Sequence, residues 1–481
     1  MTDCPFIPPK PKPLPHKANI YQRLRYGLRS GLSLFLGGSY TDLGVGRHKV
    51  PQLPDFRVRE MFTVRDPDLI REVLVKRSEE FPKSGLMDEM LHELIGYSIF
   101  VSNGEVWKRQ RRIIDPALEG ARVKEVFQRM ADAVEGCMER FAAHAARPDS
   151  ATAPIDVDIE MTHFTADVIF RTIFSEPMTA EGARRIFAAF EIFQHHAYAH
   201  GMLRLTRFPV NLLPGAFRAR KAAREIRDVL RGPIQRRLAL IEQGEEPPRD
   251  ILYSLMTTPD PASGTCFDPD ELLDQVSMLF LAGHETSAAG LAWTLYLIAN
   301  CPHIQDRMRA EVDAVLGDRA AEFGDMKRLE LIRDTFREGL RLYPPVPFVS
   351  RDATRDEKMK NRNVHEGDVV FVAPWLMQRH QVLWDRPDEF DPDRFGTEAG
   401  RESARCAYMP FSMGPRVCPG AAFALQEATL FLAELVRRFE VSPMPGHTPD
   451  PIARLTLRSS NGVPLIVQPR KRPLPQASEP P

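Results

Sequence analysis

The sequence has 481 residues, of which 43% are hydrophobic and 27% are charged, as is ordinary for a globular protein with a large buried core. A formal net charge of −1 gives no indication of binding to nucleic acid. The six cysteines form no C-x-x-C pair, and no apolar run approaches the roughly 20 residues that cross a bilayer. These features argue against a disulfide framework, an iron–sulfur or zinc site and a transmembrane segment, so we expect a cytoplasmic monomer.

The two ends of the chain differ in composition from the part between them. Residues 1–20 are rich in proline and lysine, which predicts a flexible, extended leader, and residues 470–481 predict a disordered tail. Residues 21–469 contain no repeat and no long linker, which predicts a single catalytic domain.

Within this domain the hydrophobic pattern changes from strand to helix and back. A strand is predicted over residues 57–64 and a helix over 68–77, and helical patterns dominate from 106 to 342. Alternation typical of strands returns at 368–372 and near 454–467. The predicted fold class is mainly α with a minor β-sheet region.

The longest predicted helix begins after Asp268, where Asp-Pro-Asp-Glu supplies an N-cap, a proline at the first helical position and a capping-box glutamate. It can continue to Asn300 and is apolar on all sides, as expected for a buried central helix. Near its middle lie Glu285 and Thr286, which are costly to bury without a partner. These residues alone leave two interpretations open: a structural back-bond from the threonine, or a chemical role for the pair.

A second group of polar residues shows helical spacing. Trp107 and Arg111 lie four residues apart, and Glu338 and Arg341 lie three apart, so each pair shares one helical face. Such pairs are common on solvated helices and mean little by themselves.

The most informative segment is residues 411–420, which read Phe-Ser-Met-Gly-Pro-Arg-Val-Cys-Pro-Gly. Cys418 is a candidate thiolate ligand of haem iron, because Gly414 and Gly420 let the backbone approach a flat ring and Arg416 offers a cation to a propionate. A helix predicted over 421–439 would direct its free amides at the sulfur and help to keep it ionised. The alternative is a buried structural cysteine in a turn.

These motifs, in this order, resemble those of the cytochrome P450 superfamily over roughly residues 40 to 468. The cysteine loop matches Phe-x-x-Gly-x-Arg-x-Cys-x-Gly at every fixed position, and residues 282–287 match Ala/Gly-Gly-x-Asp/Glu-Thr-Thr/Ser. The resemblance implies the cytochrome P450 fold, with haem b between the long central helix and the helix that follows Cys418.

The resemblance also implies roles for individual residues. Cys418 would be the metal ligand, Thr286 would hydrogen-bond dioxygen, Glu285 would relay protons, and Ala282 and Gly283 would leave room for the oxygen. The other residues implied in cofactor binding are Trp107, Arg111, Arg351, Phe411, Gly414, Arg416 and Gly420. A structural triad of Glu338, Arg341 and Arg394 would lock the cysteine loop, although the usual Pro-Glu-Arg-Phe segment reads Pro-Asp-Arg-Phe at 392–395.

The implied activity is monooxygenation of a hydrophobic small molecule, by hydroxylation or epoxidation with O₂ as co-substrate. No nucleotide or flavin motif is present in the sequence, so electrons from NAD(P)H would arrive through a ferredoxin or flavodoxin-type donor and its reductase. The residues expected to line the substrate pocket are Leu86, Ile99, Phe100, Met278, Leu281, Val346, Phe348, Val349 and Leu457.

Two alternative functions remain at this stage. A peroxide-driven peroxygenase of this type tends to carry Arg-Pro where this chain has Glu285-Thr286. A haem-thiolate gas sensor or carrier would have no need of a proton relay, so the same two residues argue against it.

Overall fold

The computed structural model describes residues 5–11, 39–48, 59–204 and 214–470. The fold is mainly helical with four small sheets, as predicted. The longer helices are α3 (Gly85–Ile95), α4 (Gly104–Leu118), α5 (Gly120–Ala145), α6 (Val157–Phe174), α7 (Ala180–Arg204), α8 (Pro214–Glu242), α10 (Pro269–Ala299), α11 (Pro302–Leu316), α12 (Glu330–Leu342), α14 (Glu398–Ala407) and α15 (Ala421–Arg438). The shorter helical segments are α2 (Pro67–Arg71), η2 (Glu72–Lys76), α9 (Ile251–Thr257), η4 (Phe323–Arg328), α13 (Pro374–Met377), η5 (Pro392–Gly396) and η6 (Gly414–Arg416).

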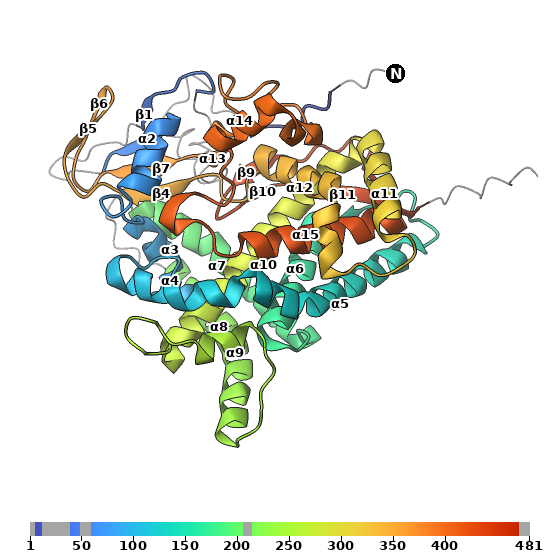
Figure 1. Ribbon diagram of the computed structural model, residues 1–481, viewed down its shortest axis with the longest axis horizontal. Helices are drawn as coiled ribbons and strands as arrows, with labels where there is room; N and C mark the ends of the chain where they lie inside the picture. The colour runs from blue at the N-terminus through green and yellow to red at the C-terminus, as the bar shows by residue number, and fades with distance from the viewer. Residues whose placement is uncertain (1–4, 12–38, 49–58, 205–213, 471–481) are drawn as a thin grey trace, which may run out of the picture.

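The strands form small sheets. The largest sheet has the order β1 (Val45–His48), β2 (Met61–Val64), β7 (Val369–Val372) and β4 (Val349–Asp352), and its β2–β7 pair is parallel. The other sheets are antiparallel: β3 (Ile155–Asp156), β11 (Pro464–Pro469) and β8 (Phe439–Pro443) in one, and the hairpins β5 (Glu357–Met359) with β6 (Arg362–Val364) and β9 (Pro451–Ala453) with β10 (Leu457–Ser459). The sheet that contains β1, β4 and β7 and the β5–β6 hairpin lie at one side of the helical body, and β11 lies near the other side (Figure 1).

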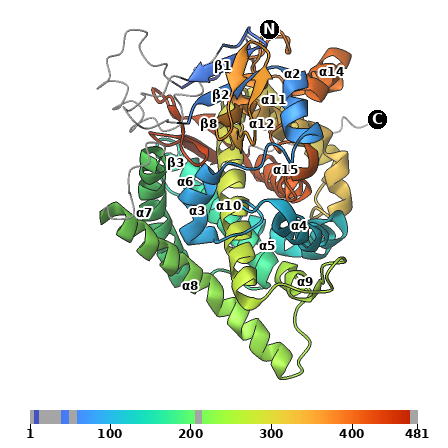
Figure 2. The same ribbon diagram turned by 90° about the vertical axis from the view of Figure 1, so that its left-hand side faces the viewer.

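Helix α10 passes through the centre of the molecule (Figure 2). Asp268 caps it by accepting hydrogen bonds from the backbone amides of Asp270 and Glu271, and Glu271 completes the capping box. The predicted signals therefore locate the start of the helix correctly. From Leu272 to Ala299 nearly every side chain is buried, which confirms the prediction of a central helix.

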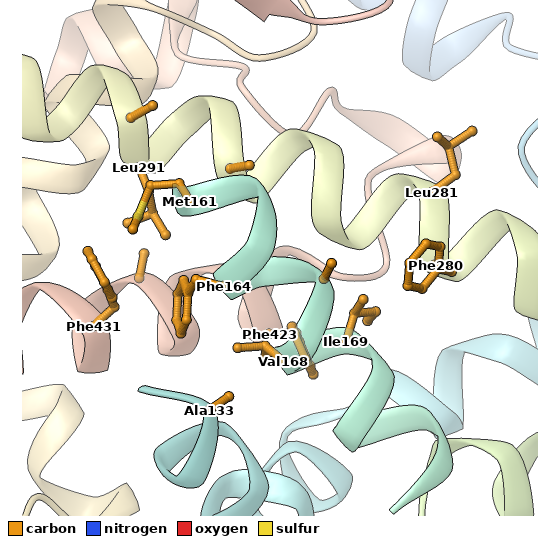
Figure 3. Packing of buried hydrophobic residues seen from close by; sticks show 14 of the residues in the cluster. Ala133, Met161, Phe164, Val168, Ile169, Phe280, Leu281, Leu291, Phe423 and Phe431 are labelled. Atoms are coloured by element: carbon orange, nitrogen blue, oxygen red, sulfur yellow. The ribbon is translucent and has the colours of Figure 1, made fainter. Parts of the chain in front are cut away.

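Helix α6 lies between α10 on one side and α15 and α5 on the other (Figure 3). Phe164 of α6 packs against Phe431 of α15, with ring centroids 4.8 Å apart. Opposite α6, a Cβ on Gly283 would lie 2.8 Å from Cδ1 of Ile169. The glycine therefore permits the close approach of α6 and α10, and its role in leaving room for an oxygen ligand stays a prediction.

Part of the predicted leader is attached to the body. The Phe390 amide donates to the Phe6 carbonyl (3.1 Å), the Tyr343 hydroxyl donates to the Pro9 carbonyl (2.6 Å), and Lys10 pairs with Asp388 (2.6 Å). Residues 5–11 thus contact the body at three points, and the flexibility of the leader as a whole stays a prediction. The rest of the leader, at 1–4 and 12–20, and the tail from 471 to 481 lie outside the described residues. No helix in the described ranges is both long and apolar enough to cross a membrane.

A buried acid joins α15 to the central helix. Glu427 of α15 has almost no exposed surface and its carboxyl is hydrogen-bonded to Ser287 of α10. Burial raises the pKa of Glu427 to about 8, and the Ser287 hydrogen bond offsets only part of this rise. The folded protein therefore keeps this carboxyl protonated at neutral pH.

This raised pKa predicts a pH-dependent stability. Because the folded state holds the Glu427 proton more tightly than the unfolded state, its contribution is complete below the unfolded pKa and is lost as pH rises toward about 8. Relative to Glu427→Gln, the wild type should lose roughly 2 kcal/mol of unfolding free energy between pH 6 and 8. Denaturant titrations at both pH values measure this difference, with the exposed Glu440→Gln as control. Parallel pH profiles for wild type and Glu427→Gln would contradict the prediction.

Candidate functional site

The cysteine loop is a tight turn that leads into α15. The Cys418 amide donates to the Phe411 carbonyl (2.9 Å), and the Gly420 amide donates to the Cys418 thiol. Gly414 has φ +75°, and a Cβ there would clash with the Leu74 carbonyl oxygen of η2. Gly414 is therefore required by the turn and by its contact with η2, and its role in admitting a haem ring stays a prediction.

Two groups near the thiol favour its ionised form. Desolvation raises the pKa of Cys418, and the Gly420 amide and the Arg111 guanidinium offset part of this rise. That the amides of the following helix help to keep the sulfur ionised stays a prediction. A bound haem iron would add to this stabilisation, because coordination deprotonates a thiol outright.

The predicted triad is formed. Glu338 accepts two hydrogen bonds from Arg341 (2.7 and 2.8 Å) and one each from Arg394 Nε (3.2 Å) and the Asp391 amide (3.1 Å). The two guanidiniums also donate to carbonyls within residues 378–389. Burial opposes the charge on Glu338, but the two arginines lower its pKa, so the carboxyl stays ionised. The triad thereby fixes this segment to α12.

Gln378 connects this segment to the cysteine loop. Its side-chain amide donates to the carbonyls of Leu340 (2.9 Å) and Arg341 (3.0 Å), and its oxygen accepts from the Met409 amide (2.9 Å). Because Met409 lies two residues before the loop, Gln378 connects the buried network to the start of the loop. No local sequence pattern distinguishes Gln378.

Cations gather between the cysteine loop, α4 and β4. Arg416 donates to the Ser78 and Phe81 carbonyls (2.7 and 3.0 Å), and its guanidinium lies over the Trp107 ring, 5.2 Å from the centroid. Arg351 is buried on β4, and burial, then Arg416, lowers its pKa to about 10. None of the described carboxylates forms a salt bridge with Arg351 or Arg416.

Lys83 also belongs to this cation cluster, although no local sequence pattern marks it. Its ammonium donates to the Ile99 and Ser102 carbonyls and lies 5.7 Å from the Trp107 ring centroid. Burial, followed by the charges of Arg416 and Arg351, lowers the pKa of Lys83 to about 6. An anion beside these groups would relieve their repulsion.

The residues present fit a haem. The Nε atoms of Arg351 and Arg416 are buried without a hydrogen-bond partner in the described structure, which is a costly arrangement unless an acceptor binds there. Haem propionates are acceptors of this kind. Arg111 contributes differently, because it bonds Asp115 (2.8 Å) and the Val417 carbonyl (2.6 Å) and so braces the residue before Cys418.

On α10, the acid and the alcohol have different environments. The Thr286 hydroxyl donates to the Ala282 carbonyl (2.7 Å), as the structural interpretation expected. Glu285 is paired with Arg458 of β10, whose Nη2 lies 2.7 Å from Oε2, and accepts from the Thr456 hydroxyl (2.7 Å). Burial opposes its ionisation, but Arg458 holds the pKa of Glu285 at about 2.

An apolar cavity adjoins these residues. It is lined by Met87, Met90, Leu91, Ile95, Phe100, Met278, Leu281, Ala282, Glu285, Thr286, Val346, Pro347, Phe348, Arg454, Leu455 and Thr456.

Four residues expected in the pocket do not line this cavity: Leu86, Ile99, Val349 and Leu457. Leu86 lies on α3 next to the face that carries Met87 and Met90, and Val349 belongs to β4. The backbone of Leu457 accepts the Trp293 indole N–H (2.9 Å), and that of Ile99 donates to Gln275 (3.0 Å). These residues pack within the hydrophobic core around the cavity.

Comparison with known proteins agrees with this geometry. The protein family described as Cytochrome P450 matches residues 55–467. The chain is 31% identical to cyclooctatin synthase of Streptomyces melanosporofaciens, over 86% of this chain and 87% of the relative. It is also 31% identical to 11-oxo-beta-amyrin 30-oxidase of Glycyrrhiza uralensis, over 84% of this chain and 78% of the relative.

The solved haem domain of cytochrome P450DA superposes with a TM-score of 0.80 at 25% identity, over 96% of this chain and 98% of that domain. The family match, the relatives and this shared fold agree with the arrangement around Cys418. The chain therefore belongs to the cytochrome P450 family and is a haem-dependent monooxygenase.

Proposed function

We propose that this enzyme inserts one oxygen atom of O₂ into a hydrophobic small molecule, by hydroxylation or epoxidation, with electrons from a separate redox protein. The observation that carries the proposal is the apolar cavity whose wall includes Ala282, Glu285 and Thr286. It brings together space for an apolar substrate, a hydroxyl and a buried carboxylate.

The cofactor-binding residues follow from the fit described above. Cys418 would ligate the haem iron, and Arg351, Arg416, Lys83 and Trp107 would surround the propionates. When bound, haem with a thiolate ligand activates dioxygen, so that one oxygen atom can be inserted into an unactivated C–H bond or an alkene.

The polar residues of α10 would manage protons. Thr286 would present its hydroxyl to the cavity, and the carboxylate beside it would connect the cavity to solvent. Arg458 also donates to Asp158 (2.7 Å), which is partly exposed. When Glu285 takes up a proton, the Arg458 guanidinium can stay paired with Asp158. Glu285 would therefore be able to take up and release protons while Arg458 keeps a charged partner.

The electron donor would be a ferredoxin or flavodoxin-type protein with an NAD(P)H-dependent reductase. Basic side chains beside Arg111 on α4 are a poor docking surface for it, because they are already paired: Arg109 with Glu271 (2.8 Å) and Arg112 with Asp260 (2.5 Å). This face of α4 therefore offers little free positive charge to an acidic electron donor.

The haem assignment is tested by spectroscopy. The reduced enzyme with bound carbon monoxide should absorb near about 450 nm, and Cys418→His should move this band to the position of a histidine-ligated haem. Cys406→Ser, at a partly buried cysteine of α14, should leave the spectrum unchanged. A histidine-type spectrum in the unaltered protein would overturn the assignment of Cys418.

Thr286→Ala separates monooxygenation from the two alternatives. Because the hydroxyl would guide protons, its loss should lower product formation about tenfold or more and release peroxide instead. A peroxide-driven enzyme would keep most of its activity, and a gas carrier would keep its affinity. Thr294→Ala is the matched control, because Thr294 makes the same back-bond on α10, to Gly290 (2.7 Å), and does not line the cavity.

Arg458→Gln should leave the buried Glu285 charge without its partner. We expect a loss of about 3 kcal/mol in unfolding free energy at pH 8. The loss should be smaller at pH 5, since a Glu285 pKa raised in the folded variant lets the carboxyl take up a proton as pH falls. Denaturation at both pH values measures this effect, and the exposed pair Arg307–Asp393 provides the control Arg307→Gln, at under about 1 kcal/mol. An equal loss at both pH values would contradict the assignment.

A further inference from the structure

The cavity wall carries four polar side chains among apolar ones: Glu285, Thr286, Arg454 and Thr456. Three of the four have partners within the protein. Thr286 donates to the Ala282 carbonyl, Thr456 donates to Glu285, and the charge of Glu285 is balanced by Arg458. These three therefore offer no unsatisfied charge to a substrate.

Arg454 differs from them. It lies in the turn between β9 and β10, where its amide donates to the Thr456 carbonyl (3.0 Å). Its guanidinium forms no hydrogen bond or salt bridge with any side chain or carbonyl of the described residues, and the residue is exposed. It thus combines a place in the cavity wall with access to solvent, which locates it at the open end.

The turn between β9 and β10 brings two different groups to the cavity wall. Thr456, two residues beyond Arg454, donates to Glu285 beside Thr286, whereas Arg454 is exposed. The rest of the wall consists of methionine, leucine, isoleucine, valine, proline, phenylalanine and alanine side chains. A ligand in this cavity can therefore meet an exposed cation and apolar surface next to Thr286.

We propose that Arg454 binds the carboxylate of an amphipathic substrate, whose apolar body extends toward Thr286. This inference rests on the proposed monooxygenase function and narrows its substrate class to apolar monocarboxylic acids. One guanidinium can hold one carboxylate through two parallel hydrogen bonds. No second unpaired cation is present in the described wall, so a monoanion fits better than a phosphate with two charges.

The exposure of Arg454 favours this assignment. A carboxylate bound there stays partly hydrated, so the desolvation that makes buried ion pairs costly is small. The methionines Met87, Met90 and Met278 have flexible side chains that can adapt to the apolar body. Recognition would therefore fix the end of the substrate and leave the shape of the rest adjustable.

The test compares carboxylic acids with their methyl esters. Dodecanoic acid represents a straight chain and dehydroabietic acid a polycyclic body, and the blue shift of the ferric Soret band reports binding of each to the haem-loaded enzyme. At least one acid should bind about tenfold more tightly than its ester, and Arg454→Gln should remove this preference without weakening the ester. The preference should also decrease as ionic strength rises.

Lys124→Gln, which removes an exposed, unpaired positive charge on α5, is the matched control and should keep the preference. Which of the two acids binds shows whether the enzyme accepts chain-like or polycyclic acids. Equal binding of acids and esters, a preference that survives in Arg454→Gln, or no binding of either acid would overturn the inference. In each of these cases the carbon monoxide spectrum stays that of a haem-thiolate protein, whereas failure of the proposed function removes that spectrum.

Discussion

The buried network around Glu338 is the interaction on which the candidate haem site depends. Taking one carboxylate and two guanidiniums out of water is costly, and the cost is offset only because nearly every donor and acceptor is satisfied. The satisfied groups belong to the segment 378–389 and, through Gln378, to the backbone just before the cysteine loop. The backbone that leads into the cysteine loop is thus held by hydrogen bonds outside the loop. A neutral core of the same volume could match the stability of this network but not its directionality.

Helix α10 meets a related constraint at its middle. An almost wholly apolar helix can be buried without polar partners, but the carboxylate of Glu285 requires a cation in the folded state. That cation comes from a hairpin that is 173 residues away in the sequence. Docking of β9 and β10 onto α10 is consequently a condition for burying Glu285 as an ion. The same docking completes the cavity wall with Leu455 and Thr456. Electrostatics and cavity shape are therefore set by one contact.

Whether the sequence predicts a contact depends on how far apart in the sequence the contacting residues lie. The start of α10 was predictable because its capping box is contained in four consecutive residues. The triad was predictable from spacing and motif order, since Glu338 and Arg341 share one helical turn. Gln378, Lys83 and Arg458 were not predictable, because their partners lie far away in sequence and no local pattern marks them. For the cavity, the hydrophobic pattern identifies apolar residues of α3 but does not decide which of them face inward: Met87 and Met90 line the wall, and Leu86 does not.

The β9–β10 hairpin explains why the sequence motifs of the family do not identify the substrate. Arg454 and Thr456 lie in its turn, and Arg458 lies on β10. Thr456 and Arg458 contact Glu285, which must keep charged or polar partners when it is buried in α10. Arg454 has no such contact: within the described residues, its removal leaves no buried charge and breaks no hydrogen bond of its side chain. A residue that lines the cavity but makes no contact needed for folding can be substituted to change substrate specificity without loss of the fold or of catalysis. The charge present at that position is accordingly better explained by a ligand than by the fold.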